Sequence, residues 1–231
     1  MKKIGLLGGM SWESTAEYYR LINREVGRRL GGLHSARLVL ASVDFTAIEA
    51  LQVAGDWEAA GRILADEARD LEAAGAEIVV LCTNTMHKVA PAIEGAVAIP
   101  LLHLADATAR AVVDAGVRRV GLLGTAFTME QDFYVDRLRT HGLDVLTPDA
   151  VGRADVHRII YDELCHGDIR DSSRTRYAAV IGDLVTAGAE GVILGCTEIE
   201  LLVDPDGPSP VPLFPTTRLH ALAAVEFALA P

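Results

Sequence analysis

Residues 3–9 have the sequence Lys-Ile-Gly-Leu-Leu-Gly-Gly, and residues 119–125 have the similar sequence Arg-Val-Gly-Leu-Leu-Gly-Thr. A second pair of similar stretches follows in the same order. Residues 74–81 are Ala-Gly-Ala-Glu-Ile-Val-Val-Leu, and residues 187–194 are Ala-Gly-Ala-Glu-Gly-Val-Ile-Leu. The two offsets are nearly equal, 119 − 3 = 116 and 187 − 74 = 113 positions. Two ordered matches at nearly one spacing predict a duplicated structural unit.

Short apolar runs alternate with longer helical patterns on both sides of these repeats. The runs expected to form strands are residues 4–7, 38–43, 78–81, 120–123 and 192–194. The clearest helical patterns cover residues 56–74 and 216–229, and Ser14-Thr-Ala-Glu17 and Thr128-Met-Glu-Gln131 resemble capping boxes at helix starts. Strands that alternate with helices predict βαβ units around a mostly parallel sheet.

The fold expected from these patterns is therefore α/β, with two similar parallel-sheet domains. We assign residues 1–98 and 210–231 to an N-terminal lobe and residues 99–209 to a C-terminal lobe. Ligands of such sheets bind beyond the carboxyl ends of the strands, so the active site is predicted in the cleft between the lobes.

The composition of the chain narrows the classes of function. Lys and Arg number 21 against 32 Asp and Glu, which makes the net charge −11 over 231 residues and argues against a nucleic-acid partner. Three cysteines do not form a disulfide framework in a chain of this length. No run approaches the ~20 apolar residues of a membrane span, and the N-terminus does not resemble a signal peptide. We expect a cytoplasmic protein with no membrane partner.

Polar residues follow both repeated strands. Residues 82–85 are Cys-Thr-Asn-Thr, and residues 195–198 are Gly-Cys-Thr-Glu. The repeat register pairs Cys82 with a glycine and Thr83 with Cys196. Because adjacent side chains of an extended segment point to opposite sides, Cys82 and Thr83 cannot both face a site. Thr83 and Cys196 are therefore the predicted facing pair, and Cys82 is expected to be a small buried hydrophobic residue.

The sequence resembles the aspartate/glutamate racemase family over essentially the whole chain. The resemblance rests on Gly-Gly-Met-Ser at 8–11, Thr-Asn-Thr at 83–85, Gly-Thr at 124–125 and Gly-Cys-Thr-Glu at 195–198. It implies an enzyme with two similar α/β domains and no cofactor. Members of the family typically carry a cysteine at both catalytic positions. Here Thr83 stands at the first of them, which is similar to the bacterial branch specific for L-aspartate and L-glutamate.

This resemblance implies a two-base exchange of the Cα proton, with Thr83 and Cys196 as the catalytic residues. Cys196 is expected to act as a thiolate base, because the N-terminus of a following helix lowers a thiol pKa. Thr83 is a poor base and is expected to serve as a proton donor, so the two directions of the reaction should differ in efficiency. Without a cofactor, backbone amides at the starts of the helices after Thr83 and Cys196 would hold the α-carboxylate.

Other residues are predicted to contact the substrate. They are Met10, Ser11, Gln52, Asn84, Thr85, Thr125, Thr197 and Glu198. Several have structural alternatives: Ser11 as a helix cap, Gln52 as a surface residue, and Glu198 as a group that orients or deprotonates Cys196 or complements a helix dipole. His87 is expected on a helix surface. The seven histidines show no metal-ligand spacing with the cysteines, so no metal is expected.

One feature leaves the substrate and the function open. Many relatives carry a lysine shortly after a Tyr-Asp-Glu-Leu stretch, whereas here Tyr161-Asp-Glu-Leu164 is followed by Cys165 and His166, so the distal carboxylate of an acidic substrate lacks its expected partner. The alternatives are a single-cysteine decarboxylase or other isomerase of small carboxylic acids, and a non-catalytic amino-acid-binding protein. A homodimer is left open.

Overall fold

The computed structural model describes residues 1–231, which divide into two compact units. The first consists of Met1–Leu104 together with His220–Pro231, and the second of Ala105–Leu219. The boundary drawn from the sequence at residues 209 and 210 lies earlier, because residues 213–215 form a strand that pairs within the sheet of the second unit. The strand was not predicted, because the segment around it is rich in proline.

The first unit contains a four-stranded parallel sheet. Its strands are β1 (Ile4–Gly8), β2 (Leu38–Ser42), β3 (Ile78–Leu81) and β4 (Leu101–Leu102), in the order β2-β1-β3-β4. β1 and β3 are the inner strands and are entirely buried. Because every strand runs in the same direction, the segments that follow β1 and β3 emerge at one edge of the sheet.

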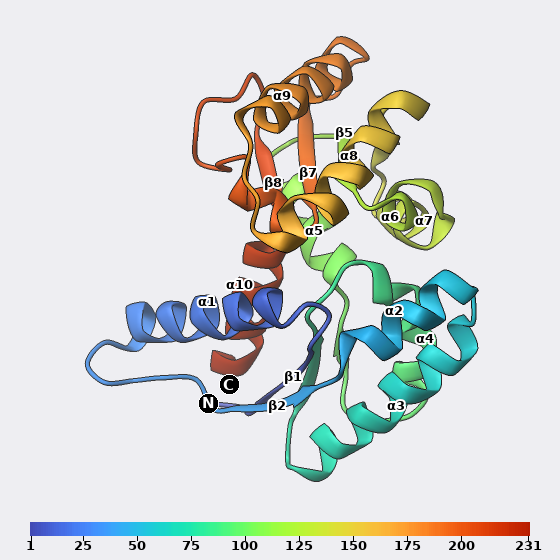
Figure 1. Cartoon of the computed structure of the whole chain (residues 1–231). Helices are drawn as coiled ribbons and strands as arrows, with labels where there is room; N and C mark the ends of the chain where they lie inside the picture. The colour runs from blue at the N-terminus through green and yellow to red at the C-terminus, as the bar shows by residue number, and fades with distance from the viewer. The chain divides into compact units, whose positions relative to one another are not determined.

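Helices cover both faces of this sheet (Figure 1). They are α1 (Trp12–Leu30), α2 (Phe45–Ala54), α3 (Trp57–Ala73), the short 3₁₀ helix η1 (Thr85–Val89), α4 (Ala90–Glu94) and the last part of α10 (Thr216–Leu229). Leu7 and Leu81 point to the face covered by α2 and α3. Ile4 and Val80 point to the opposite face, where α1 and α10 pack. The strands are therefore continuously apolar, as expected of a parallel sheet buried on both faces.

The second unit repeats this topology. Its strands are β5 (Arg119–Gly124), β6 (Asp144–Leu146), β7 (Gly191–Gly195) and β8 (Leu213–Pro215), all parallel and in the order β6-β5-β7-β8. In each unit the first strand pairs with the second and the third, and the third pairs with the fourth. The predicted α/β fold with two similar parallel-sheet units is confirmed.

The helices of the second unit pack around its own core. They are α5 (Leu104–Asp114), α6 (Ala126–Glu130), α7 (Asp132–Thr140), α8 (Ala150–Asp162), the 3₁₀ helix η2 (Leu164–His166), α9 (Asp171–Thr186) and the 3₁₀ helix η3 (Thr197–Leu201). α8 and α9 lie on the face of the sheet to which Leu123, Val192 and Leu194 point. No helix of either unit has both the length and the apolar character that a membrane span requires.

Both predicted capping boxes are wrong in position. α1 begins at Trp12, and its cap is Ser11, whose Oγ accepts a hydrogen bond from the Ser14 N–H at 3.3 Å. α6 is capped by Thr125, which accepts from the Thr128 N–H at 3.4 Å. In each unit a hydroxyl residue in the turn after the first strand caps the following helix, because the strand-to-helix turn is shorter than the sequence pattern indicated.

Candidate active site

The turn after β1 depends on two glycines that approach other atoms closely. Gly9 has φ +94°, and a Cβ atom there would collide with the Val43 carbonyl. A Cβ on Gly8 would collide with Thr15, which is buried and hydrogen-bonded on two sides. Its Oγ1 accepts from the Gly9 N–H at 2.9 Å and donates to the Ser11 carbonyl at 2.9 Å. Thr15 thus holds the segment that presents Ser11 at the edge of the sheet.

Met10 and Ser11, both predicted to bind substrate, lie in this turn. Met10 is buried and packs with the core on the α2 and α3 face. Ser11 is the cap of α1. The structural alternative for Ser11 is therefore present, and the contact of either residue with a substrate stays a prediction.

At the end of β3 the chain turns at Cys82. The Cys82 N–H donates to the Leu7 carbonyl at 2.9 Å, and the Thr83 N–H donates back to the Leu81 carbonyl at 2.9 Å. Cys82 is fully buried in the core formed with α1 and α10, and this burial raises the pKa of its thiol. The predicted burial of Cys82 is confirmed. Thr83, the next residue, is only half-buried.

Asn84 and Thr85 follow Thr83 and are both largely buried, with 6% and 8% of their surface exposed. Asn84 precedes η1 without a side-chain cap bond to it. Gln52 lies on α2 rather than in a loop, and it is buried, with its Nε2 3.0 Å from the Met86 sulfur. The surface alternative for Gln52 is wrong, because α2 packs over the segment that follows β3.

The second unit brings a comparable set of residues to the end of β7. A Cβ on Gly195 would lie 2.7 Å from the Leu123 carbonyl, so the close pairing of β7 with β5 requires glycine. Cys196 follows with extended backbone, φ −154° and ψ 135°, and is half-buried. Its Sγ donates a hydrogen bond to Glu198 Oε2 at 2.9 Å. The structure thus shows a thiol with a carboxylate acceptor two residues away.

The environment of Cys196 differs from the one expected from sequence. η3 is a 3₁₀ helix of only five residues, so it provides little of the dipole that lowers a thiol pKa. Burial instead raises the pKa of Cys196 well above its ordinary value, and the Glu198 charge and hydrogen bond raise it further. Cys165, exposed on η2, which packs against η3, has an effect in the same direction. The expectation of a thiolate created by a helix N-terminus is wrong.

Thr197 and Thr125 also lie at this edge of the second sheet. Thr197 Oγ1 is 3.0 Å from the hydroxyl of Thr217, and the hydroxyl of the neighbouring Thr216 donates to the Leu194 carbonyl at 2.9 Å. Thr125 Oγ1 is 3.2 Å from the hydroxyl of Thr128. Thr217 was not among the predicted site residues. Thr216 and Thr217 directly follow the last strand. Their position could have identified them, because the other candidate residues were also chosen as polar residues at strand ends.

The expected surface position of His87 is wrong. It is 2% exposed rather than on a helix surface, and its ring lies 4.6 Å from that of His103 and 5.8 Å from that of His220. Its position four residues after Thr83 in a single-turn helix directs the ring inward. No group of three or more His, Cys, Asp or Glu side chains in the chain is arranged to hold a metal ion.

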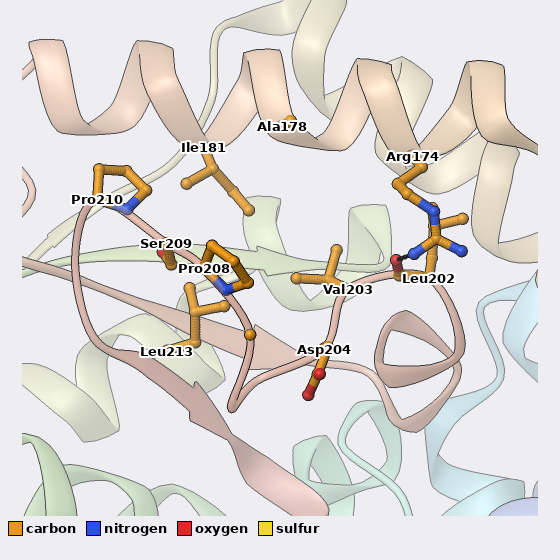
Figure 2. Close-up of a pocket in the computed structure, with 11 residues that line it drawn as sticks. Arg174, Ala178, Ile181, Leu202, Val203, Asp204, Pro208, Ser209, Pro210 and Leu213 are labelled. Carbon is orange, nitrogen blue, oxygen red and sulfur yellow. Dashed lines mark hydrogen bonds between the residues drawn. The ribbon is translucent and has the colours of Figure 1, made fainter.

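A cavity of about 260 Å³ lies elsewhere in the second unit (Figure 2). It is mostly apolar and opens between α9 and the proline-rich loop before β8, with Ile181 pointing toward the loop and Arg174 at one end. Arg174 donates to the Leu202 carbonyl at the end of η3. None of the ten predicted site residues lines this cavity, so it does not form part of the candidate site.

Comparison with known proteins places this arrangement in a family. The model of the Asp/Glu/hydantoin racemase family matches residues 7–224. The chain belongs to this family. A candidate Asp/Glu racemase from Yersinia pestis is 55% identical and superimposes with a TM-score of 0.95 over the whole of both chains. An aspartate racemase homologue from Pyrococcus horikoshii OT3 is 34% identical, with a TM-score of 0.87, also over the whole of both chains.

A more distant solved structure in the comparison shows the fold alone. The aspartate racemase of Picrophilus torridus is 19% identical, with a TM-score of 0.77 over 99% of this chain and 94% of that one. The predicted resemblance to the aspartate/glutamate racemase family is thus confirmed, and the two parallel-sheet units are the racemase fold. The family is one of isomerases.

Proposed function

We propose that this racemase-family protein interconverts the L- and D-forms of aspartate or glutamate by proton exchange at Cα, without a cofactor. The observation that carries the proposal is the hydrogen bond from the Cys196 thiol to Glu198 at the end of β7. A partly exposed thiol beside a carboxylate can act as a nucleophile or base, because the carboxylate can accept the thiol proton. A residue used only for packing needs no such acceptor.

Cys196 acts as the base in this proposal. Its S–H proton passes to Glu198, and the resulting thiolate removes the Cα proton of the amino acid to form a carbanion. Because the pKa of Cys196 is raised, the thiolate is scarce near neutral pH, but it is also a stronger base toward the weakly acidic Cα–H. The raised pKa therefore lowers the fraction of Cys196 that is present as thiolate. It also raises the rate at which each thiolate removes the Cα proton.

Thr83 supplies the proton on the opposite face of the carbanion. Its hydroxyl donates to Cα, and the alkoxide that remains takes a proton from water. The hydroxide formed in this way takes the proton that Glu198 received from Cys196, which restores all three groups. An alcohol donates to a carbanion far more readily than it acts as a base, so kcat should be higher in the direction that begins with abstraction by Cys196. KM should be higher by the same factor in that direction, because the equilibrium constant between two enantiomers is one and kcat/KM must be equal in both directions. This asymmetry is also what the substitution of threonine for the first cysteine of the family pattern implies.

The remaining predicted residues hold the substrate. Main-chain N–H groups after Thr83 and Cys196, with the side chains of Asn84, Thr85 and Thr197, would donate to the α-carboxylate and stabilise the charge that develops next to it. The other predicted contacts are Met10, Ser11, Gln52 and Thr125. No lysine follows Leu164, so the distal carboxylate must find another cation. The distance of that cation from Cα would decide between aspartate and glutamate, whose side chains differ by one methylene.

Incubation with each pure enantiomer of aspartate and glutamate in D₂O, without added cofactor, tests this function. Proton NMR reports Cα exchange, and circular dichroism reports racemisation. Exchange with at least one of these amino acids supports the proposal. Its absence with all of them rejects it, and binding without exchange indicates an amino-acid-binding protein. Release of CO₂ from a disubstituted malonate indicates a decarboxylase.

Two cysteine variants provide the matched comparison. Cys196→Ala should abolish exchange, whereas Cys82→Ala removes a thiol buried in the core and should keep most of it. The opposite result would show that the register argument assigned the wrong cysteine. A homodimer stays a prediction, which light scattering of the protein in solution would test.

A further inference from the structure

His87 is bound to main-chain groups through both of its ring nitrogens. Its Nδ1 lies 2.7 Å from the Thr83 carbonyl oxygen, and its Nε2 lies 3.1 Å from the amide nitrogen of Leu104. A carbonyl oxygen only accepts and an amide N–H only donates. The ring must therefore be neutral, with its proton on Nδ1 and its lone pair on Nε2. This tautomer is the one arrangement that satisfies both bonds.

The bond to Thr83 completes the anchoring of that residue's backbone. The Thr83 N–H donates to Leu81, and the Thr83 carbonyl accepts from His87. With both main-chain groups held, the hydroxyl of Thr83 can move only by rotation about χ1. The carbonyl also belongs to the peptide plane that it shares with the Asn84 N–H, and in a trans peptide these two groups point in opposite directions. His87 therefore sets the direction of the Asn84 N–H as well.

The ring of His87 is itself held by its neighbours. It lies against His103, and its other neighbour, His220, has both ring nitrogens occupied. His220 Nε2 donates to the Leu102 carbonyl at 2.7 Å, and the Tyr18 hydroxyl donates to His220 Nδ1 at 2.8 Å. His87 thus ties the start of α5 to the segment after β3, whereas His220 ties β4 to α10 and α1, and neither ring can turn without breaking a buried hydrogen bond.

We propose that His87 is a positioning residue for the reaction, one that fixes Thr83 as the proton donor through its carbonyl rather than through its side chain. This inference rests on the proposed function, because it assigns His87 a part in the reaction at Thr83. A displacement of a reacting group by about 1 Å is expected to lower the rate by about a hundredfold. Loss of the His87–Thr83 bond should therefore lower kcat by about this factor, with a smaller change in KM.

Three substitutions separate the two bonds of His87. In His87→Asn the side-chain NH₂ takes the place of Nδ1–H and can still donate to the Thr83 carbonyl. In His87→Gln the amide oxygen reaches the place of Nε2 and can accept from Leu104, but the bond to Thr83 is lost. His87→Phe keeps the ring shape and loses both bonds. Steady-state racemisation with the substrate identified for the wild-type protein measures kcat and KM of each.

The expected order of kcat is wild type, then His87→Asn within about tenfold, then His87→Gln and His87→Phe lower by about a hundredfold. Equal activity of the Asn and Gln variants, or a Phe variant as active as the wild type, would overturn the proposal. A purely structural role would lower stability without separating Asn from Gln. If all three variants fail to fold, ¹⁵N NMR of the wild-type protein still decides, since a proton on Nε2 of His87 contradicts the geometry. Absence of exchange by the wild type would reject the proposed function instead.

Discussion

Replacement of Gly8 by alanine should destabilise the first unit and disturb the turn that carries Ser11. The added Cβ would collide with Oγ1 and Cγ2 of Thr15 and lie 2.9 Å from its Cβ. Thr15 is buried on the first turns of α1 and cannot move toward solvent. Either β1 or α1 must shift, or the Thr15 side chain must leave its rotamer.

The magnitude follows from the contacts that are lost. Overpacking of a buried site costs about 1–3 kcal/mol. Thr15 also makes two hydrogen bonds, to the Gly9 N–H and the Ser11 carbonyl, and each contributes about 1 kcal/mol. The lower entropy of the unfolded chain with alanine offsets about 0.5–1 kcal/mol. The net loss in free energy of unfolding is therefore about 3 kcal/mol.

Urea denaturation followed by circular dichroism measures this loss. With a slope of about 2–3 kcal/mol per molar urea, the midpoint should fall by about 1 M. Gly182→Ala is the matched control, because Gly182 lies inside α9 and a Cβ there meets no atom within 4 Å. That control should raise stability by up to about 1 kcal/mol through helix propensity. Equal midpoints for the two variants would refute the packing argument.

Three further predictions concern titrating groups. Iodoacetamide should label the exposed Cys165 of the native protein and leave the buried Cys82 unmodified, as peptide mass spectrometry would show, and labelling of both would contradict the core assignment. Burial lowers the pKa of His220 to about 4, so the unfolded state binds the extra proton between pH 6.5 and 4. Stability should therefore fall as the pH drops through this range, by at most about 1.4 kcal/mol per pH unit, and His220→Gln should give a flatter slope in urea titrations at several pH values. Glu198→Gln should lower the pKa of Cys196, because the carboxylate raises it, and shift the pH profile of exchange to lower pH. The maximal rate should nevertheless fall by about a hundredfold, because the proton acceptor is gone, and an unchanged maximum would remove Glu198 from the mechanism.

Five of the eight strands, β1, β2, β3, β5 and β7, and the duplication could be predicted because their signals are local. β3 has the predicted bounds, and β1 and β7 extend the predicted strands by one or two residues, since continuous apolar runs between glycines are typical of strands buried on both faces. Helix starts were harder to predict. The cap was given to Thr128 rather than Thr125, and for α1 the capping-box pattern at Ser14 competed with the alternative of Ser11 as the cap, because a cap depends on the turn that precedes it.

The chemistry at the two strand ends was predictable only in part. Alternation along an extended segment correctly buried Cys82 beside Thr83. The pKa of Cys196 was expected to be lowered by a helix N-terminus, but the following helix is a 3₁₀ helix of five residues, and burial and the Glu198 charge raise that pKa. The burial of the thiol and the type of the following helix are set by three-dimensional packing, and a pattern of residue types does not contain them, although it did place Glu198 two residues after Cys196.

The sequence by itself determined the α/β class, the twofold repeat and the polar segments after β3 and β7, because hydrophobic periodicity and repeated strings are properties of neighbouring residues. Only the tertiary structure decided that His87 is buried, that its two ring nitrogens hold Thr83 and Leu104, and that Thr217 meets Thr197. These contacts join residues from different elements. Such pairs are set by how helices pack on a sheet, and burial then makes each hydrogen bond obligatory.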